Sequence, residues 1–142
     1  MWCTGRWAAA PLCVFRKEGP IALKQRRGIY VGRLDYEKGV LRMLRDIGKI
    51  YNIFRKPLII AGVGPLEKVV RSLNSGVIKY IGYLKPEEVP ILLSRAYAVI
   101  IPSYTEGLPS VYLEARKCGV PYIVMYSDNP LSKWLADITL KA

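Results

Sequence analysis

The sequence predicts an α/β domain in which a parallel sheet carries helices on both faces. Short apolar segments alternate with helical patterns from residue 28 onward, as they do in strand-helix-strand units with right-handed crossovers. The chain is also 51% hydrophobic but only 11% aromatic, which suits a sheet that is buried on both sides. Its 142 residues can bury roughly two-thirds of the unfolded surface, so we expect one folded domain.

Five segments are predicted to be strands, because each is short, apolar and partly β-branched or aromatic. They are residues 28–33, 57–62, 77–82, 98–102 and 121–126. The clearest helix is predicted over 38–54, where apolar residues recur at helical spacing and the Arg and Lys residues take the other face. Pro65, Pro86 and Pro109 mark the beginnings of three further helices, since proline is favoured in the first turn.

The composition excludes several kinds of chemistry. The three cysteines, Cys3, Cys13 and Cys118, have neither the spacing of a zinc site nor the even count of a disulfide framework. The chain has no histidine, which removes imidazole bases and His-ligated metals. No run approaches the roughly 20 apolar residues of a membrane helix. We therefore expect a cytoplasmic protein with reduced thiols and no bound metal.

The net charge of +11 is unevenly distributed. Residues 1–27 hold six Lys or Arg and one Glu, which leaves +5, and residues 28–142 hold sixteen against ten, which leaves +6. We predict a basic, poorly ordered arm over 1–27 and the folded domain over 28–142. The arm has two interpretations, a peripheral contact with the inner membrane face and a solvated tail, and we favour the tail. The scattered basic residues do not indicate nucleic-acid binding.

The ten residues EGLPSVYLEA, Glu106 to Ala115, follow the fourth predicted strand. They place one carboxylate in a loop, a Gly-x-Pro turn behind it, and a second carboxylate, Glu114, on the next helix. A helix that begins at the end of a buried strand directs its first N–H groups into the crevice where α/β sheets bind ligands. The segment therefore predicts an anionic ligand.

This segment resembles the Glu-x7-Glu signature of retaining GT-B glycosyltransferases of the group 1 type. Three other segments are similar to motifs of those enzymes in the same order: YVGRL with EKG over 30–39, IIAGVGPL over 59–66 and YIGY over 80–83. Four ordered matches over about a hundred residues are specific, whereas each alone is weak. The resemblance implies a Rossmann-like domain, one half of a GT-B enzyme, that binds a nucleotide-sugar donor.

The chain departs from the family at both ends. An acceptor-binding domain comes first in the family, whereas only 27 residues precede the resemblance here. Near the other end, SDNP at 127–130 stands where a Gly-rich stretch is usual, and the closing helices of the family do not follow. We therefore expect a C-terminally truncated domain that lacks its acceptor-binding partner.

Gly32, Arg33 and Lys38 form the first candidate cluster. Gly32 ends a strand with little steric bulk, Arg33 offers a planar fork to phosphate oxygens, and Lys38 adds a compact charge. The resemblance implies that Arg33 and Lys38 hold the diphosphate and stabilise its charge as the glycosidic bond breaks. The alternative is a surface ion pair of either residue with Asp35 or Glu37.

The resemblance also implies the remaining donor contacts. Glu114 would bind the ribose hydroxyls and Glu106 those of the transferred sugar; alternatively, Glu106 caps the helix electrostatically and Glu114 is solvated. The nucleobase would lie just after Gly82, where Tyr83 could stack on it. The leaving phosphate would lie against the main chain of four residues, Gly107, Leu108, Pro109 and Ser110.

Gly62-Val63-Gly64-Pro65 predicts a tight structural turn. The full Gly-x-Gly-x-x-Gly pattern is absent because Glu67 occupies its third place, so a nicotinamide dinucleotide is disfavoured. We interpret the chain as the donor-binding half of a glycosyltransferase that retains anomeric configuration and needs no cofactor or metal. Two alternatives stay open: a non-catalytic donor-binding module or relic, and a nucleotide-sugar epimerase, which the lack of histidine disfavours.

Overall fold

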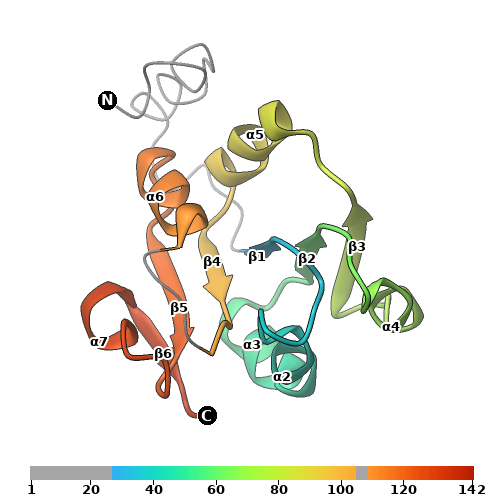
Figure 1. Cartoon of the computed structure of the whole chain (residues 1–142), viewed down its shortest axis with the longest axis horizontal. Coiled ribbons are helices and arrows are strands. Elements are labelled where there is room, and N and C mark those ends of the chain that lie inside the picture. Colours follow the sequence, from blue (N-terminus) through green and yellow to red (C-terminus); the bar gives the residue numbers. More distant parts are fainter. Residues whose placement is uncertain (1–26, 105–108) are drawn as a thin grey trace.

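The structure, a computed structural model, describes residues 27–104 and 109–142. In these residues six strands form one parallel sheet with the order β3-β2-β1-β4-β5-β6 (Figure 1). Their bounds are β1 Gly28–Val31, β2 Leu58–Ala61, β3 Ile78–Gly82, β4 Ala98–Ile101, β5 Tyr122–Tyr126 and β6 Ile138–Leu140.

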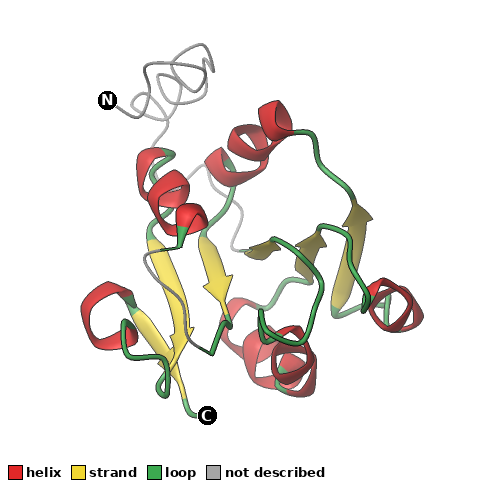
Figure 2. Cartoon of the chain, in the orientation of Figure 1, coloured by secondary structure: helices red, strands yellow, loops and turns green. Residues whose placement is uncertain are grey.

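Helices cover both faces of the sheet. Helices α2, α3 and α4 lie on one face, and α5 and α6 lie on the other (Figures 1 and 2). The bounds are α2 Val40–Arg45, α3 Ile47–Phe54, α4 Glu67–Ser72, α5 Val89–Ser94, α6 Ser110–Lys117 and α7 Ser132–Leu135, with a short 3-10 helix, η2, at Pro86–Glu88. The predicted α/β parallel fold with helices on both faces is confirmed.

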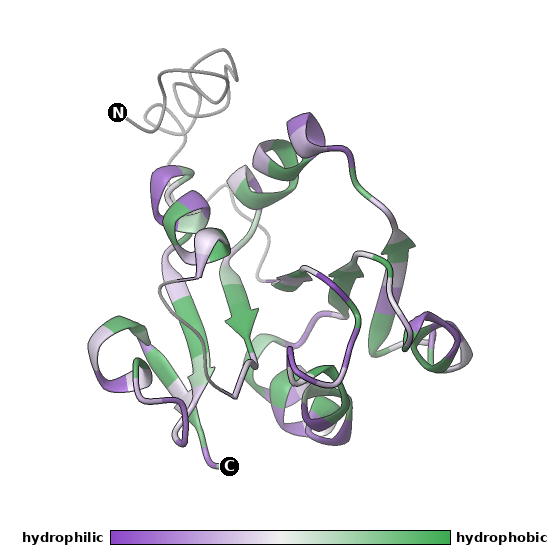
Figure 3. Ribbon diagram, in the orientation of Figure 1, coloured by the Kyte–Doolittle hydropathy of each residue, from purple (hydrophilic) through white to green (hydrophobic). Residues whose placement is uncertain are grey.

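The strands form because their residues are apolar on both sides. Ile29 packs with the α5–α6 side, whereas its neighbour Tyr30 packs with the α2–α4 side. The same division separates Val99 from Ile100 on β4, since successive side chains of a strand point to opposite faces. Figure 3 shows the result, with hydrophobic strands between helices whose outer surfaces are hydrophilic.

Two elements differ from the predictions. Strand β6 was not predicted. Its three residues are too few to show a periodic pattern, and the pairing with β5 that forms it cannot be read from those residues. The predicted helix over 38–54 is divided at Asp46 into α2 and α3. Asp46 is buried at the junction, where the hydroxyl of Tyr126 lies 2.8 Å from its carboxylate, so a core contact takes the place of regular helix geometry.

Strand β1 lies where the strand order reverses. Its neighbours are β2 on one side and β4 on the other, so the chain segments that leave β1 and β4 diverge at their carboxyl ends. In open α/β sheets this switch point is the place where ligands bind. Among the described residues, no helix is long and apolar enough to span a membrane.

Candidate functional site at the switch point

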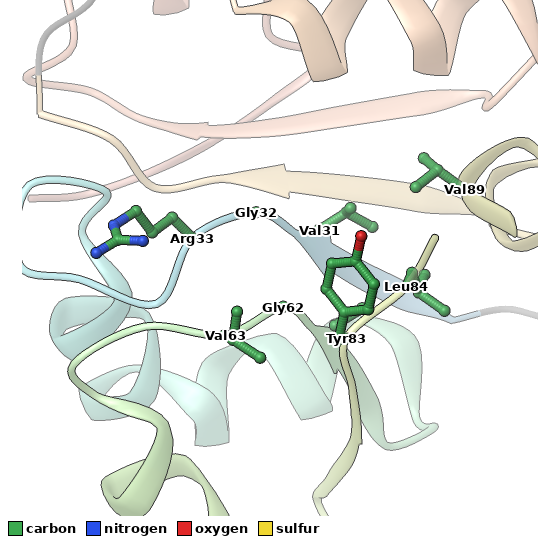
Figure 4. Close-up of a pocket in the computed structure, with 9 residues that line it drawn as sticks. Val31, Gly32, Arg33, Gly62, Val63, Tyr83, Leu84 and Val89 are labelled. Atoms are coloured by element: carbon green, nitrogen blue, oxygen red, sulfur yellow. The ribbon is translucent and has the colours of Figure 1, made fainter. Parts of the chain in front are cut away.

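Two cavities meet at the carboxyl end of β1, and both are lined by Val31, Gly32 and Arg33. The first has a volume of about 250 Å³ and is lined in addition by Ala61, Gly62, Val63, Tyr83, Leu84 and Val89 (Figure 4). The second has a volume of about 150 Å³ and lies toward β4 and α6. Its further lining residues are Tyr30, Lys38, Ile100, Ile101, Pro102, Ser103, Pro109, Ser110 and Val111.

The first cavity is mainly apolar. Tyr83 and Arg33 lie at its two ends, with Gly32 and Gly62 between them (Figure 4). The Tyr83 ring is 64% exposed, so one aromatic face is accessible at the mouth. An apolar cavity beside an exposed ring suits a planar, uncharged group.

Gly62 allows the loop after β2 to pack closely against the loop after β1. Its φ angle is 139°, and a Cβ atom there would lie 1.8 Å from the carbonyl oxygen of Gly32. The loops after β1 and β2 are also joined by hydrogen bonds from Gly32 N to Ala61 O and from Leu34 N to Val63 O. Because these contacts are with main chain, they support the prediction that Gly62 and its neighbours form a structural turn.

The second cavity is cationic. Arg33 and Lys38 line it, and so does the N-terminus of α6. Pro109 is the N-cap of α6 and has no side-chain oxygen to accept from the first-turn N–H groups. That first turn contains no acidic residue. Two basic side chains and the positive end of a helix therefore face one space, which suits an anion.

The surface ion pair that competed with a phosphate role is present for Arg33. Its Nε lies 3.2 Å from Oδ2 of Asp35, and Asp35 Oδ1 accepts a hydrogen bond of 2.9 Å from the main-chain N of Lys38. Asp35 therefore orders the loop between β1 and α2. The Arg33 side chain remains 61% exposed and borders both cavities, so this contact at Nε leaves the guanidinium accessible to a ligand.

The structure brings most of the predicted residues together. Gly32, Arg33, Lys38, Pro109 and Ser110 border the second cavity, and their contact with a phosphate stays a prediction. Tyr83 borders the first, and Gly82 precedes it with a main-chain oxygen that accepts from Gly62 N at 2.8 Å.

Besides Gly82, which lines neither cavity, four predicted residues are not placed in the cavities. Glu114 is half-buried on α6 and is not among the described residues that line either cavity. Glu106, Gly107 and Leu108 lie outside the described residues. Their roles therefore stay predictions.

Sequence reasoning missed Arg42. The helical pattern placed the basic residues of 38–54 on the exposed face, but Arg42 is only 5% exposed. Its guanidinium donates hydrogen bonds to Pro102 O at 2.9 Å and Ser103 O at 3.0 Å, and it binds both carboxylate oxygens of Asp128 at 2.8 Å. The only local signal was an arginine in the first turn of a helix whose N-cap is Gly39.

Asp46, the buried acid at the junction of α2 and α3, stays ionised. A hydrogen bond from Arg45 lowers the pKa of the Asp46 carboxyl, against the opposing effect of burial. Burial raises the pKa of the Tyr126 hydroxyl, and the hydrogen bond with Asp46 raises it further. Tyr126 therefore remains a neutral donor to a charged carboxylate at neutral pH.

The described residues contain no group of three or more side chains suited to holding a metal ion. The fold and the site together define an α/β domain with an apolar and a cationic cavity at its switch point, the usual location of nucleotide sites in such sheets.

Comparison with known proteins identifies the family. The model of the glycosyl transferases group 1 family matches residues 14–134. The chain therefore belongs to this glycosyltransferase family. The O-antigen chain mannosyltransferase B of Escherichia coli is 31% identical over 103 residues, which are 67% of this chain and 27% of that protein. The chain thus spans about a quarter of the length of this relative.

Solved structures confirm the fold. The pneumococcal O-GlcNAc transferase GtfA, solved with UDP and GlcNAc, matches 84% of this chain and 25% of its own, with a TM-score of 0.68 and 18% identity. A trehalose-6-phosphate synthase, studied for glycosyl transfer with retention, matches 91% of this chain and 38% of its own, with a TM-score of 0.65 and 14% identity.

Proposed function

We propose that this chain is the donor-binding half of a glycosyltransferase that moves a sugar from a nucleoside diphosphate to an acceptor. One observation carries the proposal: an apolar cavity and a cationic cavity share Gly32 and Arg33. A nucleoside diphosphate has two parts that match these cavities. Its base is planar and uncharged, and its diphosphate is anionic. In this proposal the base occupies the first cavity and the diphosphate the second.

The proposed chemistry is stabilisation of the leaving group. When the bond between the sugar and the diphosphate breaks, negative charge grows on the phosphate oxygens. Arg33 and Lys38 would neutralise part of that charge, and the first N–H groups of α6 at Ser110 and Val111 would donate hydrogen bonds to it. These groups are in place before the reaction, so the proposed mechanism needs no bound metal. Activity that persists in excess EDTA is the expected result.

The two carboxylates are proposed to divide the rest of the donor. Glu114 would bind the ribose, which every nucleotide carries, and Glu106 would bind the transferred sugar. Retention of configuration belongs to the same proposal and is supported by the Glu-x7-Glu pattern and by the retaining transferase that shares the fold. Glu114→Gln should weaken the nucleotide and its sugar alike, whereas Glu106→Gln should weaken only the sugar-bearing ligand.

The acceptor would be held by residues outside this segment. The chain covers 27% of its mannosyltransferase relative, so most of such an enzyme has no counterpart here. Positioning of two reactants can supply roughly 7 to 11 kcal/mol of a barrier reduction. The chain by itself is therefore expected to bind donor and to hydrolyse it only slowly. A donor-binding module without activity of its own is the second candidate.

A location in the cytoplasm is also proposed, with the basic arm as a solvated tail and a peripheral contact at the inner membrane face as the alternative. Co-sedimentation with vesicles of anionic lipid, with and without residues 1–26, tests the arm.

A thermal-shift panel tests the function. UDP, GDP and ADP, each with the matching monophosphate, are added to the wild-type chain at equal concentration. A ligand at a hundred times its dissociation constant adds about 2.7 kcal/mol of stability. One diphosphate should raise the melting temperature more than its monophosphate does. If no diphosphate shifts the transition at millimolar concentration, the proposed function is wrong.

A further inference from the structure

We propose that Arg42, which touches neither cavity, positions the wall of the cationic cavity and thereby sets the preference for a diphosphate over a monophosphate. The inference rests on the proposed function. It concerns Arg42 together with the two tyrosines, Tyr104 and Tyr126, that enclose its guanidinium.

The guanidinium is held in three directions. Its carbon atom lies 4.0 Å from the ring centre of Tyr104 and 4.1 Å from that of Tyr126. In the plane of the group, Nε and Nη2 donate to Pro102 O and Ser103 O, and Nη1 binds Asp128. A rigid planar fork is required for this combination, because donors at fixed angles must reach two carbonyls and a carboxylate at the same time.

These contacts converge on the segments that leave β4 and β5. Pro102 and Ser103 line the cationic cavity together with Arg33 and Lys38. The Ser103 carbonyl accepts a second hydrogen bond of 3.0 Å from Nδ2 of Asn129, which is 1% exposed. The wall of the cavity is thus tied to α2 and to the β5–β6 connection by buried polar contacts.

Gly39 brings α2 close enough for this arrangement. Its φ angle is 74°, and a Cβ atom there would lie 2.0 Å from Pro102 O. Helix α2 therefore begins against the same carbonyl that accepts from Arg42 Nε. The two contacts together determine the distance between the end of β4 and the loop that carries Arg33 and Lys38.

A role in stability alone does not explain the arrangement. Buried ion pairs can often be replaced by apolar residues without loss of stability, so they are weak stabilisers. Arg42 instead uses its donors on main-chain oxygens of the cavity wall. A small displacement of this wall would shift the end of β4 relative to the loop that carries Arg33 and Lys38, and would thereby weaken the contacts of these two residues with the phosphate.

The charge-preserving variant Arg42→Lys tests the inference. Lysine keeps the positive charge, but its single head cannot reach both carbonyls and Asp128 at once. Calorimetry measures the dissociation constants of a nucleoside monophosphate and of the matching diphosphate. The nucleoside is the one of uridine, guanosine and adenosine that the thermal-shift panel selects. We expect the preference for the diphosphate to fall about five-fold, with monophosphate affinity unchanged within about two-fold.

Arg116→Lys is the matched control. Arg116 also binds a carboxylate, that of Asp137 at 2.9 Å, and lies 5.4 Å from the ring centre of Tyr112, but it borders neither cavity. Its replacement should leave the preference unchanged. If Arg42→Lys does not fold, Tyr104→Leu takes its place as the test. Tyr104 is 44% exposed, and its replacement removes one of the two rings that stack on the guanidinium. The preference for the diphosphate should then fall about two-fold.

The outcomes separate the two proposals. A wild-type chain without any preference for the diphosphate contradicts the proposed function, and the inference falls with it. A wild-type preference that Arg42→Lys or its substitute retains overturns only the inference. Equal weakening of both nucleotides also overturns it, because that result describes a general loss of structure.

Discussion

The two cavities at the switch point share Gly32 and Arg33 but differ in how they are built. The first is enclosed by apolar side chains and by main chain that packs against main chain, as at Gly62 and Gly32. The second is enclosed by two basic side chains, the start of α6 and a wall tied to buried Arg42. In the proposed function the first therefore selects shape, whereas the second selects charge. Tyr83 lines only the first cavity and Lys38 only the second, so the two can be altered separately.

Gly62→Ala should have the largest effect, because the new side chain would displace Gly32, which lines both cavities. The new methyl group would overlap the Gly32 carbonyl, and alanine is strained at a φ of 139°. We expect at least about 2 kcal/mol of lost stability and loss of both mono- and diphosphate binding. Chemical denaturation and calorimetry measure the two effects.

Gly48→Ala is the control for that substitution. Gly48 lies in α3 with no atom within 4 Å of the position of its Cβ, so alanine should stabilise the chain by about 0.5 to 1 kcal/mol and leave binding unchanged. If the two glycine variants behaved alike, the close approach of the two loops would not be what the site requires.

Arg33→Ala should affect mainly the charged cavity, although Arg33 also borders the end of the apolar cavity away from Tyr83. Hydrogen bonds to charged groups contribute about 1.5 to 3 kcal/mol, and the exposure of Arg33 places the expected loss near the lower end, about ten-fold in diphosphate affinity. Arg71 is an apt control, because it is also 61% exposed and also paired with a carboxylate, that of Glu67 at 2.8 Å. Calorimetry that showed equal losses for the two alanine variants would contradict a specific phosphate contact.

Tyr83→Ala should affect the apolar cavity alone. Stacking of a base on an aromatic ring contributes about 1 to 3 kcal/mol, and for this exposed ring we expect about a five-fold loss that is the same for mono- and diphosphate. Tyr36 is exposed to a similar degree, 65% against 64%, but borders neither cavity. Tyr36→Ala should change neither affinity, and a loss restricted to the diphosphate in Tyr83→Ala would reverse the assignment of the two cavities.

Asp46→Asn should have the smallest effect on binding and should appear only in the stability. The folded-state pKa of Asp46 is lowered, so its stabilisation is present above the ordinary value of 3.8 and is lost as the pH falls through the lowered value. The variant should lose about 1 kcal/mol at neutral pH and show a weaker decline of stability in acid. Urea denaturation between pH 2 and pH 7 checks this, and an unchanged acid profile would show that Asp46 is not coupled to folding.

The parts that could be predicted from sequence are those with a local cause. Strands such as β4 are short apolar runs, and Gly32, Arg33 and Pro109 stand at the strand and helix ends where their conformational and charge preferences apply. These residues reach the same crevice because parallel strands bring their carboxyl ends to one edge of the sheet.

The remainder depends on contacts between distant segments. Arg42 and Asp128 are 86 residues apart, and helical spacing alone placed Arg42 in solvent. The division at Asp46 depends on Tyr126, 80 residues away, and β6 depends on its pairing with β5. The sequence left two roles open for Arg33, an ion pair with Asp35 and a contact with phosphate. The ion pair is present, and it does not exclude the phosphate contact because the paired guanidinium still borders the cavities.

The most direct test of the account is to observe which amides respond to the ligand. In ¹⁵N-labelled protein, the preferred nucleoside monophosphate should shift the amide signals of Val63, Tyr83 and Leu84 at the first cavity. The diphosphate should shift these and also the signals of Lys38, Ser110 and Val111 at the second. Signals near the amino ends of the strands, such as those of Tyr97 and Ile123, should not move. Identical shifts for the two nucleotides, or shifts confined to the amino ends of the strands, would contradict the division of the site into an apolar and a cationic cavity.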